Sequence, residues 1–345
     1  MLSRSGNKIF KLKLLIPATI LLILIVARIT LPYVLLKKAN AYLSEFSPIF
    51  YFHINDLETS LIRTTCRFQE VTGKLKSSNQ QFLKIESFDT SIAWRLILKG
   101  RLQSDISTKK LDLLIIKENY FFSTLKQEVL KLKEKIGSLK IERADLNNAS
   151  IAFENYKSLA DGSSLKLSNI NGRITNISPS EKSPLSYFNL TAILVDQTSE
   201  LKMVGELNLL KRPPTWNLDA EVRNLQLAAL NPYFKKHLPL TFTKGTVDIY
   251  SEVKSEDGKT EGYIKPFFKG IKIVANKDKV TKVKHFGVEL LPVLIDLVLH
   301  QSKNKSFAAN IEFEYDKKIK IKTSKRHRGQ LNPGIDDRYQ LTNVL

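Results

Sequence analysis

The stretch that decides the fold, residues 216–223, reads Trp216-Asn217-Leu218-Asp219-Ala220-Glu221-Val222-Arg223. Apolar residues take every second position, and polar or charged residues take the positions between them. Successive side chains of a β-strand point to opposite faces, so a period of two is typical of a strand with one apolar and one solvated face. We therefore predict a strand here whose two faces differ in polarity.

The same alternation recurs on both sides of this strand. It is clear in residues 201–209, where Val204 alone is out of phase, and in 247–253 and 311–321; it is weaker in 82–92, 139–153, 165–174 and 188–194. Short turn sequences such as Ser255-Glu256-Asp257-Gly258 separate the strands and leave no room for helical crossovers. The expected fold is mainly β, with a long curved antiparallel sheet that is apolar on one face.

Two segments have helical instead of alternating periodicity. Residues 122–136 place apolar side chains at helical spacing, and residues 286–300 are more apolar but contain Glu289, Pro292 and Asp296. The second segment is too short and too charged for a membrane span. We predict two accessory helices that pack on the sheet or close its end.

The longest apolar segment is residues 12–36. No charged residue lies between Leu14 and Ala27, and about 23 residues of helix cover roughly 34 Å, enough to cross a bilayer. Arg28 lies near the exit, where its side chain can reach the interface, and Pro32 marks a change to an interfacial helix. We predict an uncleaved transmembrane signal-anchor whose key residues are Leu14, Leu22, Val26, Arg28, Pro32 and Tyr33.

The charges around this segment predict its orientation. Arg4, Lys8, Lys11 and Lys13 precede it and only Lys37 and Lys38 follow directly, so the positive-inside rule places residues 1–11 in the cytoplasm and the rest across the membrane. A cleavable signal peptide is the alternative, although no small-x-small cleavage site follows the apolar run.

The whole chain is strongly basic, with 54 Lys+Arg against 34 Asp+Glu and a net charge of +20. Such an excess attracts polyanions or anionic lipid headgroups. The basic residues are scattered and are not interleaved with exposed aromatics in one block, so we expect no nucleic acid partner. A membrane-facing role is favoured over simple solubility.

Sequence signatures of catalysis are absent. No nucleophile elbow, phosphate-binding loop, zinc-protease motif or calcium loop occurs, and the five histidines are isolated. Cys66 is the only cysteine, which excludes an intramolecular disulfide and a multi-cysteine zinc site. We expect no enzymatic activity, no cofactor and no metal.

The apolar face of so many strands needs a cover, and two helices are too few. A long sheet can curl so that this face lines its own trough. A narrow trough is filled by side chains and is a plain core, which the residues alone favour, whereas a wide trough needs a lipid tail or a partner. The residues predicted to line it are Trp216, Leu218, Val222, Val247, Ile249, Val253, Ile311 and Phe313.

A likeness to a known family changes this balance. Residues 224–273 contain an Asn-Pro dipeptide after an apolar strand, a strand that begins with glycine, and a Gly-Tyr-x-Lys-Pro strand; the motif residues are Asn231, Pro232, Gly245, Gly262, Tyr263, Lys265 and Pro266. This stretch resembles the bacterial family called domain of unknown function 748, a branch of the AsmA-like superfamily. The likeness is specific in this centre and weaker over residues 10–325, and Leu31-Pro32-Tyr33 is similar to the family's entry into its soluble part.

The resemblance implies an inner-membrane protein of Gram-negative bacteria whose periplasmic part is a β-groove, with larger relatives implicated in phospholipid movement. The implied organisation is a cytoplasmic N-terminus (1–11), the anchor (12–36), a periplasmic groove domain (37–325) and a flexible basic tail (326–345). The expected partners are inner-membrane phospholipid and other envelope proteins. The alternative is an envelope scaffold with a filled β core and no ligand.

Overall fold

The computed structural model describes residues 5–60, 65–92, 102–116, 139–154, 165–178, 184–194, 198–208, 211, 213–231, 240–275, 306–316 and 318–326. These residues form one α-helix, α1 (Ser5–Glu45), a short 3-10 helix, η1 (Leu227–Leu230), and a single sheet of thirteen strands. The strands are β1 (Phe50–Ser60), β2 (Thr65–Leu75), β3 (Gln81–Ile92), β4 (Leu102–Ile116), β5 (Leu139–Glu154), β6 (Leu165–Ile177), β7 (Ser186–Leu194), β8 (Ser199–Asn208), β9 (Thr215–Gln226), β10 (Leu240–Glu256), β11 (Lys259–Ala275), β12 (Ser306–Asp316) and β13 (Lys318–Arg326).

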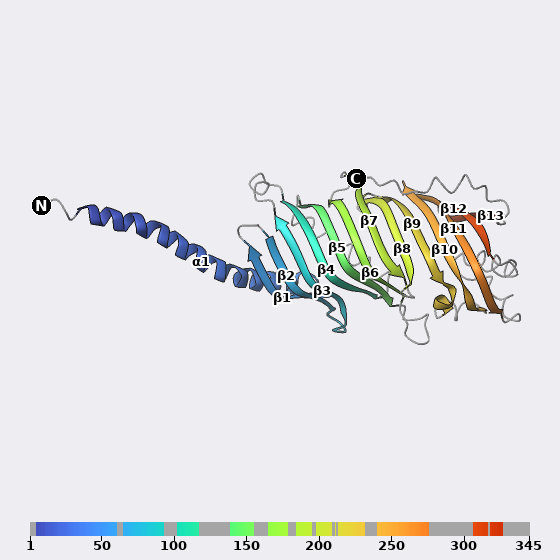
Figure 1. Ribbon diagram of the computed structural model, residues 1–345, viewed down its shortest axis with the longest axis horizontal. Helices are drawn as coiled ribbons and strands as arrows, with labels where there is room; N and C mark the ends of the chain where they lie inside the picture. The colour runs from blue at the N-terminus through green and yellow to red at the C-terminus, as the bar shows by residue number, and fades with distance from the viewer. Residues whose placement is uncertain are drawn as a thin grey trace.

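The strands lie side by side in chain order from β1 to β13 (Figure 1). Every neighbouring pair is antiparallel except β4 and β5, which are parallel. The prediction of a mainly β, mostly antiparallel sheet is therefore confirmed. The prediction that all connections are too short for a crossover is wrong between β4 and β5. Parallel neighbours need a connection of a dozen or more residues, and residues 117–138 are long enough to provide it.

The two accessory helices are not observed. Both predicted segments, residues 122–136 and 286–300, lie outside the described residues, among which α1 is the single α-helix. The first of these segments falls within the connection between β4 and β5.

Helix α1 projects from the β1 end of the sheet (Figure 1). Helix α1 continues through Pro32 to Glu45 and β1 begins at Phe50, so the change from a membrane helix to an interfacial helix at Pro32 stays a prediction. Proline removes one backbone donor, and a long helix can continue past it with at most a kink. The predicted span lies inside α1; within the described part of the chain, no helix has the length and apolar character that crossing a membrane requires.

Two asparagine side chains complete the hydrogen bonding of unpaired strand backbone. The Asn40 amide of α1 donates to the Ile54 carbonyl and accepts from the Ile54 N–H of β1, both at 2.8 Å. Asn231, directly after η1, makes the same pair with Phe242 of β10, at 2.7 and 2.8 Å. Each amide takes the place of a neighbouring strand, because a buried backbone donor and acceptor need partners. Asn40 thereby fixes the end of α1 to the edge of the sheet.

Bulges form a crease across the sheet. Glu70, Lys110, Asn148 and Asn169, in β2, β4, β5 and β6, have φ angles between 49° and 54°. The pairing register shifts near Asn148 and Asn169, and Asn224 marks a similar site in β9. A bulge bends its strand and increases the local twist, so aligned bulges curl the sheet along one line. Asparagine is one of the few residues enriched in this conformation, so the sequence could mark Asn148, Asn169 and Asn224 but not Glu70 or Lys110.

We expect Asn148→Val to destabilise the protein by about 1–2 kcal/mol, because a β-branched residue is strained at positive φ, and Asn148→Gly to be nearly neutral. The measurement is chemical unfolding followed by circular dichroism. Asn189→Val is the matched control: Asn189 lies exposed on β7 in ordinary strand pairing, and valine there should change the stability by less than about 0.5 kcal/mol. An equal loss of stability in Asn148→Val and Asn189→Val would show that the positive φ at Asn148 has no special role in the bend.

Asn231→Leu should cost about 1–3 kcal/mol, because the backbone groups of Phe242 lose both partners. Amide hydrogen exchange at Phe242 should accelerate more than at Val253, which retains its strand partners in the same β10. Unchanged protection at Phe242 would show that the Asn231 side chain does not hold this backbone.

Candidate functional site

The pairing registers divide the sheet into two faces of opposite character, because paired residues on neighbouring strands point to the same side. One row of paired residues crosses all thirteen strands and contains no charge: Thr59, Cys66, Thr90, Ile106, Ala144, Ile174, Phe188, Gly205, Leu218, Val253, Gly262, Phe313 and Ile321. The parallel row from Leu57 to Thr323 is also uncharged. We call the side that carries these rows the apolar face.

The row between these two lies on the opposite side, which we call the polar face. Its members are Glu58, Arg67, Asp89, Ser107, Asp145, Arg173, Asn189, Val204, Asp219, Glu252, Tyr263, Glu312 and Lys322. Val204, which is out of phase in the sequence, is the one aliphatic member of this row. The division between the faces therefore persists from β1 to β13.

The apolar face is only partly packed. One buried cluster, Phe50, Phe82, Ile115 and Ile116, lies near α1, and a second, Ala149, Ile170, Ala192 and Leu201, lies at the middle of the sheet. The residues of the uncharged row are mostly half-buried instead of fully buried. A fully filled core would bury most of them, so this row is not packed as completely as the two buried clusters.

The eight predicted trough residues share the apolar face. The register pairs Leu218 with Val253 and Val222 with Ile249, while Trp216 faces Leu207 and Ser255. Ile311 and Phe313 lie on β12, two strands from β10. Val247 and Ile311 are almost fully buried, with 2% and 1% exposed, and the other six are half-buried. The alternation of apolar and polar residues predicts which face a side chain points to. How completely that side chain is buried depends on the tertiary packing around it.

Aromatic rings connect α1 with the apolar face. Phe46, directly after α1, contacts Phe52 of β1 edge to face at 6.3 Å between ring centres. Phe52 meets Phe82 at 5.8 Å, and Phe82 meets Phe50 at 5.0 Å. This aromatic path was not predicted, because its members come from three elements that only the tertiary fold brings together. It makes the apolar surface continuous from the helix to the sheet.

The family-motif residues have structural positions. A side chain at Gly262 would meet the Glu252 carbonyl oxygen at 2.3 Å, and Gly245 has a φ of 118° that disfavours other residues. Pro266 is fully buried opposite Ile249, whereas Pro232 lies outside the described residues. On the polar face, the Tyr263 hydroxyl hydrogen bonds to Glu252, and the Lys265 ammonium lies 4.0 Å above the Tyr263 ring. None of these positions requires a ligand.

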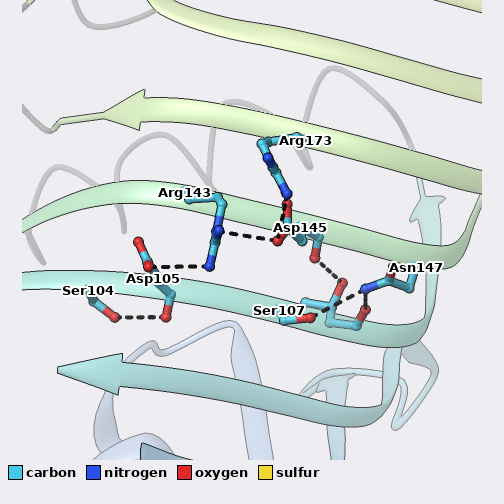
Figure 2. Close-up of polar contacts among 8 residues, drawn as sticks. Ser104, Asp105, Ser107, Arg143, Asp145, Asn147 and Arg173 are labelled. Atoms are coloured by element: carbon cyan, nitrogen blue, oxygen red, sulfur yellow. Dashed lines mark hydrogen bonds and ion pairs between the residues drawn. The ribbon is translucent and has the colours of Figure 1, made fainter. Parts of the chain in front are cut away.

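The polar face is held by ion pairs between neighbouring strands. Figure 2 shows Arg143 between Asp105 and Asp145, each at 3.4 Å, and Arg173 on the other oxygen of Asp145 at 2.6 Å. Asn147 adds hydrogen bonds to Ser107 and to the Thr108 carbonyl. Solvent screens exposed pairs of this kind, so each contributes little to stability by itself. They stabilise strand pairing, and Ser107 and Asn147 line a hollow on this face together with Arg67, Asp89 and Lys109.

Chemical groups for catalysis or metal binding are not gathered in the described part of the chain. Its acidic, histidine and cysteine side chains form no cluster of three or more that could hold a metal ion. Cys66 is unpaired and half-buried on the apolar face, and burial raises the pKa of its thiol. The feature of the molecule that remains to be explained is the apolar face itself.

Asp248, on the polar face of β10, should make stability depend on pH. Burial raises the pKa of its carboxyl, but hydrogen bonds from Lys269 and from the Asn224 N–H outweigh this effect and hold the pKa below its ordinary value of 3.8. A lowered folded-state pKa stabilises the protein above the unfolded pKa, and this stabilisation is lost as the pH falls through the folded value. We expect Asp248→Asn to lower stability at pH 7 and to flatten its decline between about pH 5 and pH 1.

The measurement is urea unfolding across that pH range. Asp257→Asn, in the exposed turn before β11, is the control and should leave the profile unchanged. If the stability of Asp248→Asn falls with decreasing pH as steeply as that of the wild type, other carboxylates are responsible for the acid sensitivity.

Comparison with protein-family models and with curated proteins finds no match for this chain.

Proposed function

We propose that the chain is a membrane-anchored, non-enzymatic protein whose apolar face binds the acyl chains of lipids and takes part in lipid binding or transport in the bacterial envelope. The observation that carries this proposal is the uncharged row that crosses all thirteen strands. Burial of apolar surface contributes about 25 cal/mol per Å², so a half-buried face of this length favours a long apolar ligand. The proposal agrees with the AsmA-like resemblance of residues 224–273.

The anchor is part of the same proposal. Helix α1 covers the charge-free residues 14–27, and its described apolar side chains are solvent-exposed: Leu22 by 60%, Ile23 by 61%, Ile29 by 70% and Tyr33 by 69%. Exposed apolar surface of this extent marks a membrane or protein contact. We propose that α1 holds the chain in the inner membrane, with the sheet in the periplasm and the β1 end nearest the bilayer.

The length of the sheet limits the role. Thirteen strands at about 4.8 Å spacing extend about 60 Å, which is shorter than a bacterial periplasm. One copy would therefore act beside the inner membrane, or would pass lipid to further envelope proteins.

A second candidate is a scaffold with a filled β core. The two buried clusters and the nearly complete burial of Val247 and Ile311 favour it, because these parts of the face have no space for a ligand. The two candidates differ in what a larger side chain on the half-buried part of the face would do.

Ala220→Phe separates the two candidates. Ala220 is half-buried in the second uncharged row, between Met203 and Ser251. In an open trough, phenylalanine should occupy ligand space and reduce copurified lipid without loss of stability; in a filled core it should cost about 1–3 kcal/mol. The measurements are mass spectrometry of lipid extracts from the purified full chain and its thermal unfolding.

Asn189→Phe on the polar face is the matched control and should alter neither quantity. Absence of copurified lipid from the wild-type chain, together with a destabilised Ala220→Phe, would replace the lipid proposal by the scaffold.

A further inference from the structure

A polar hollow lies on the polar face, over strands β2 to β6. Its volume is about 580 Å³, within the range of roughly 300–1,000 Å³ that is typical of small-molecule sites. Every described residue that lines it is polar or charged, and Figure 2 shows two of them, Ser107 and Asn147. A site for an acyl chain would need apolar walls, so this hollow favours a ligand that is held by hydrogen bonds.

The crease concentrates polar side chains at this hollow. Lys109 and Lys110 are consecutive in β4, yet both line the hollow, and so do Asn147 and Asn148 in β5. In a regular strand the second residue of each pair would point to the opposite face. The φ angles of 49° at Lys110 and 54° at Asn148 interrupt the alternation, and bulges are over-represented next to active sites because they re-aim side chains in this way. Two consecutive side chains from each strand therefore reach the same space.

The charged groups of the hollow pair with one another. Arg67 donates to both carboxylate oxygens of Asp89, at 2.7 and 3.0 Å. Glu86 accepts from Lys109 at 3.1 Å and from Lys110 at 2.7 Å. Hydrogen bonds from Lys110 and Lys109 hold the pKa of the Glu86 carboxyl below its ordinary value, so this carboxylate stays ionised at neutral pH. An anionic ligand would have to compete with Glu86 and Asp89 for these cations, which favours an uncharged ligand.

The uncharged groups of the hollow have hydrogen-bonding capacity to spare. Among the described residues, the Ser87 hydroxyl and the Asn148 side-chain amide have no hydrogen-bond partner, although the Asn148 backbone N–H donates to Asn171. The Asn147 amide is held by its hydrogen bond to Ser107. Hydroxyl and amide groups both donate and accept, and the same is true of each hydroxyl of a sugar. The arrangement therefore matches a ligand with several hydroxyl groups.

We propose that this hollow binds an uncharged saccharide, whose hydroxyl groups pair with Ser87, Asn148 and the fixed side chains around them. The site lies on the face opposite to the apolar one, so it is independent of the proposed lipid binding. Asn148 has two separate roles: its backbone conformation forms the bulge, and its side chain contacts the ligand. Glycine at this position keeps the first role and removes the second.

The test is isothermal titration calorimetry on the full chain in a detergent without a sugar head group. The probes are the disaccharides chitobiose and maltose, with inorganic phosphate as the anionic comparison. We expect saturable binding of at least one disaccharide and none of phosphate. The double variant Ser87→Ala/Asn148→Gly should bind that disaccharide more weakly by about tenfold or more, because both unpartnered groups are lost. Its thermal unfolding should stay close to that of the wild type.

The matched control is Thr175→Ala/Asn189→Ala, which removes a hydroxyl and an amide from the same face outside the hollow. It should retain the wild-type affinity, and neither double variant should change the amount of copurified lipid. Absence of binding by both disaccharides overturns the proposal, as does an equal loss of affinity in the two double variants. Displacement of a bound disaccharide by phosphate would make the hollow an anion site and also overturns the proposal. Lipid binding by the apolar face would be unaffected by any of these results.

Discussion

The structure depends on one constraint: the alternation of apolar and polar residues must stay in phase from each strand to the next. A register slip of one residue would move the whole apolar set of a strand to the solvated side. The uncharged row from Thr59 to Ile321 shows that the phase is kept across twelve successive pairings. The charged pairs of the polar face act on the same constraint, because Arg143 and Arg173 both contact Asp145 only in the observed register.

Bulges allow the sheet to bend while each strand keeps its apolar residues on one side and its polar residues on the other. An extra residue in one strand would reverse its alternation unless the neighbouring strands adjust at the same level. Glu70, Lys110, Asn148 and Asn169 lie at such a level, and the apolar and polar sets keep their sides beyond it. The Asp248 carboxylate accepts a hydrogen bond from the Asn224 N–H at the corresponding bulge of β9, so a side chain replaces the interrupted strand pairing there. The sheet therefore bends at the crease and still keeps its apolar face and its polar face separate.

The sequence is informative about local pattern and less so about long-range pairing. Residues 216–223 predict β9 and its apolar side correctly, because a period of two is a local property. The parallel neighbours β4 and β5 could not be predicted in this way, because their pairing depends on a connection of more than twenty residues. The same holds for the amide of Asn40 on Ile54, whose position depends on where α1 meets the sheet. The eight predicted trough residues share one face, but their burial ranges from Val247 to the half-exposed Val253, because depth is set by neighbouring strands.

The position of α1 gives the proposed lipid trough a direction. Asn40 fixes the helix to β1, and Lys76 adds a hydrogen bond from the end of β2 to the Ser44 carbonyl at 2.9 Å. The aromatic path from Phe46 to Phe82 then joins the exposed apolar side of the helix to the first buried cluster. An acyl chain that leaves a bilayer along α1 would therefore meet apolar surface at each step, without crossing the charged polar face. If α1 lies in the membrane as proposed, these hydrogen bonds and ring contacts make the β1 end the part of the sheet nearest the bilayer.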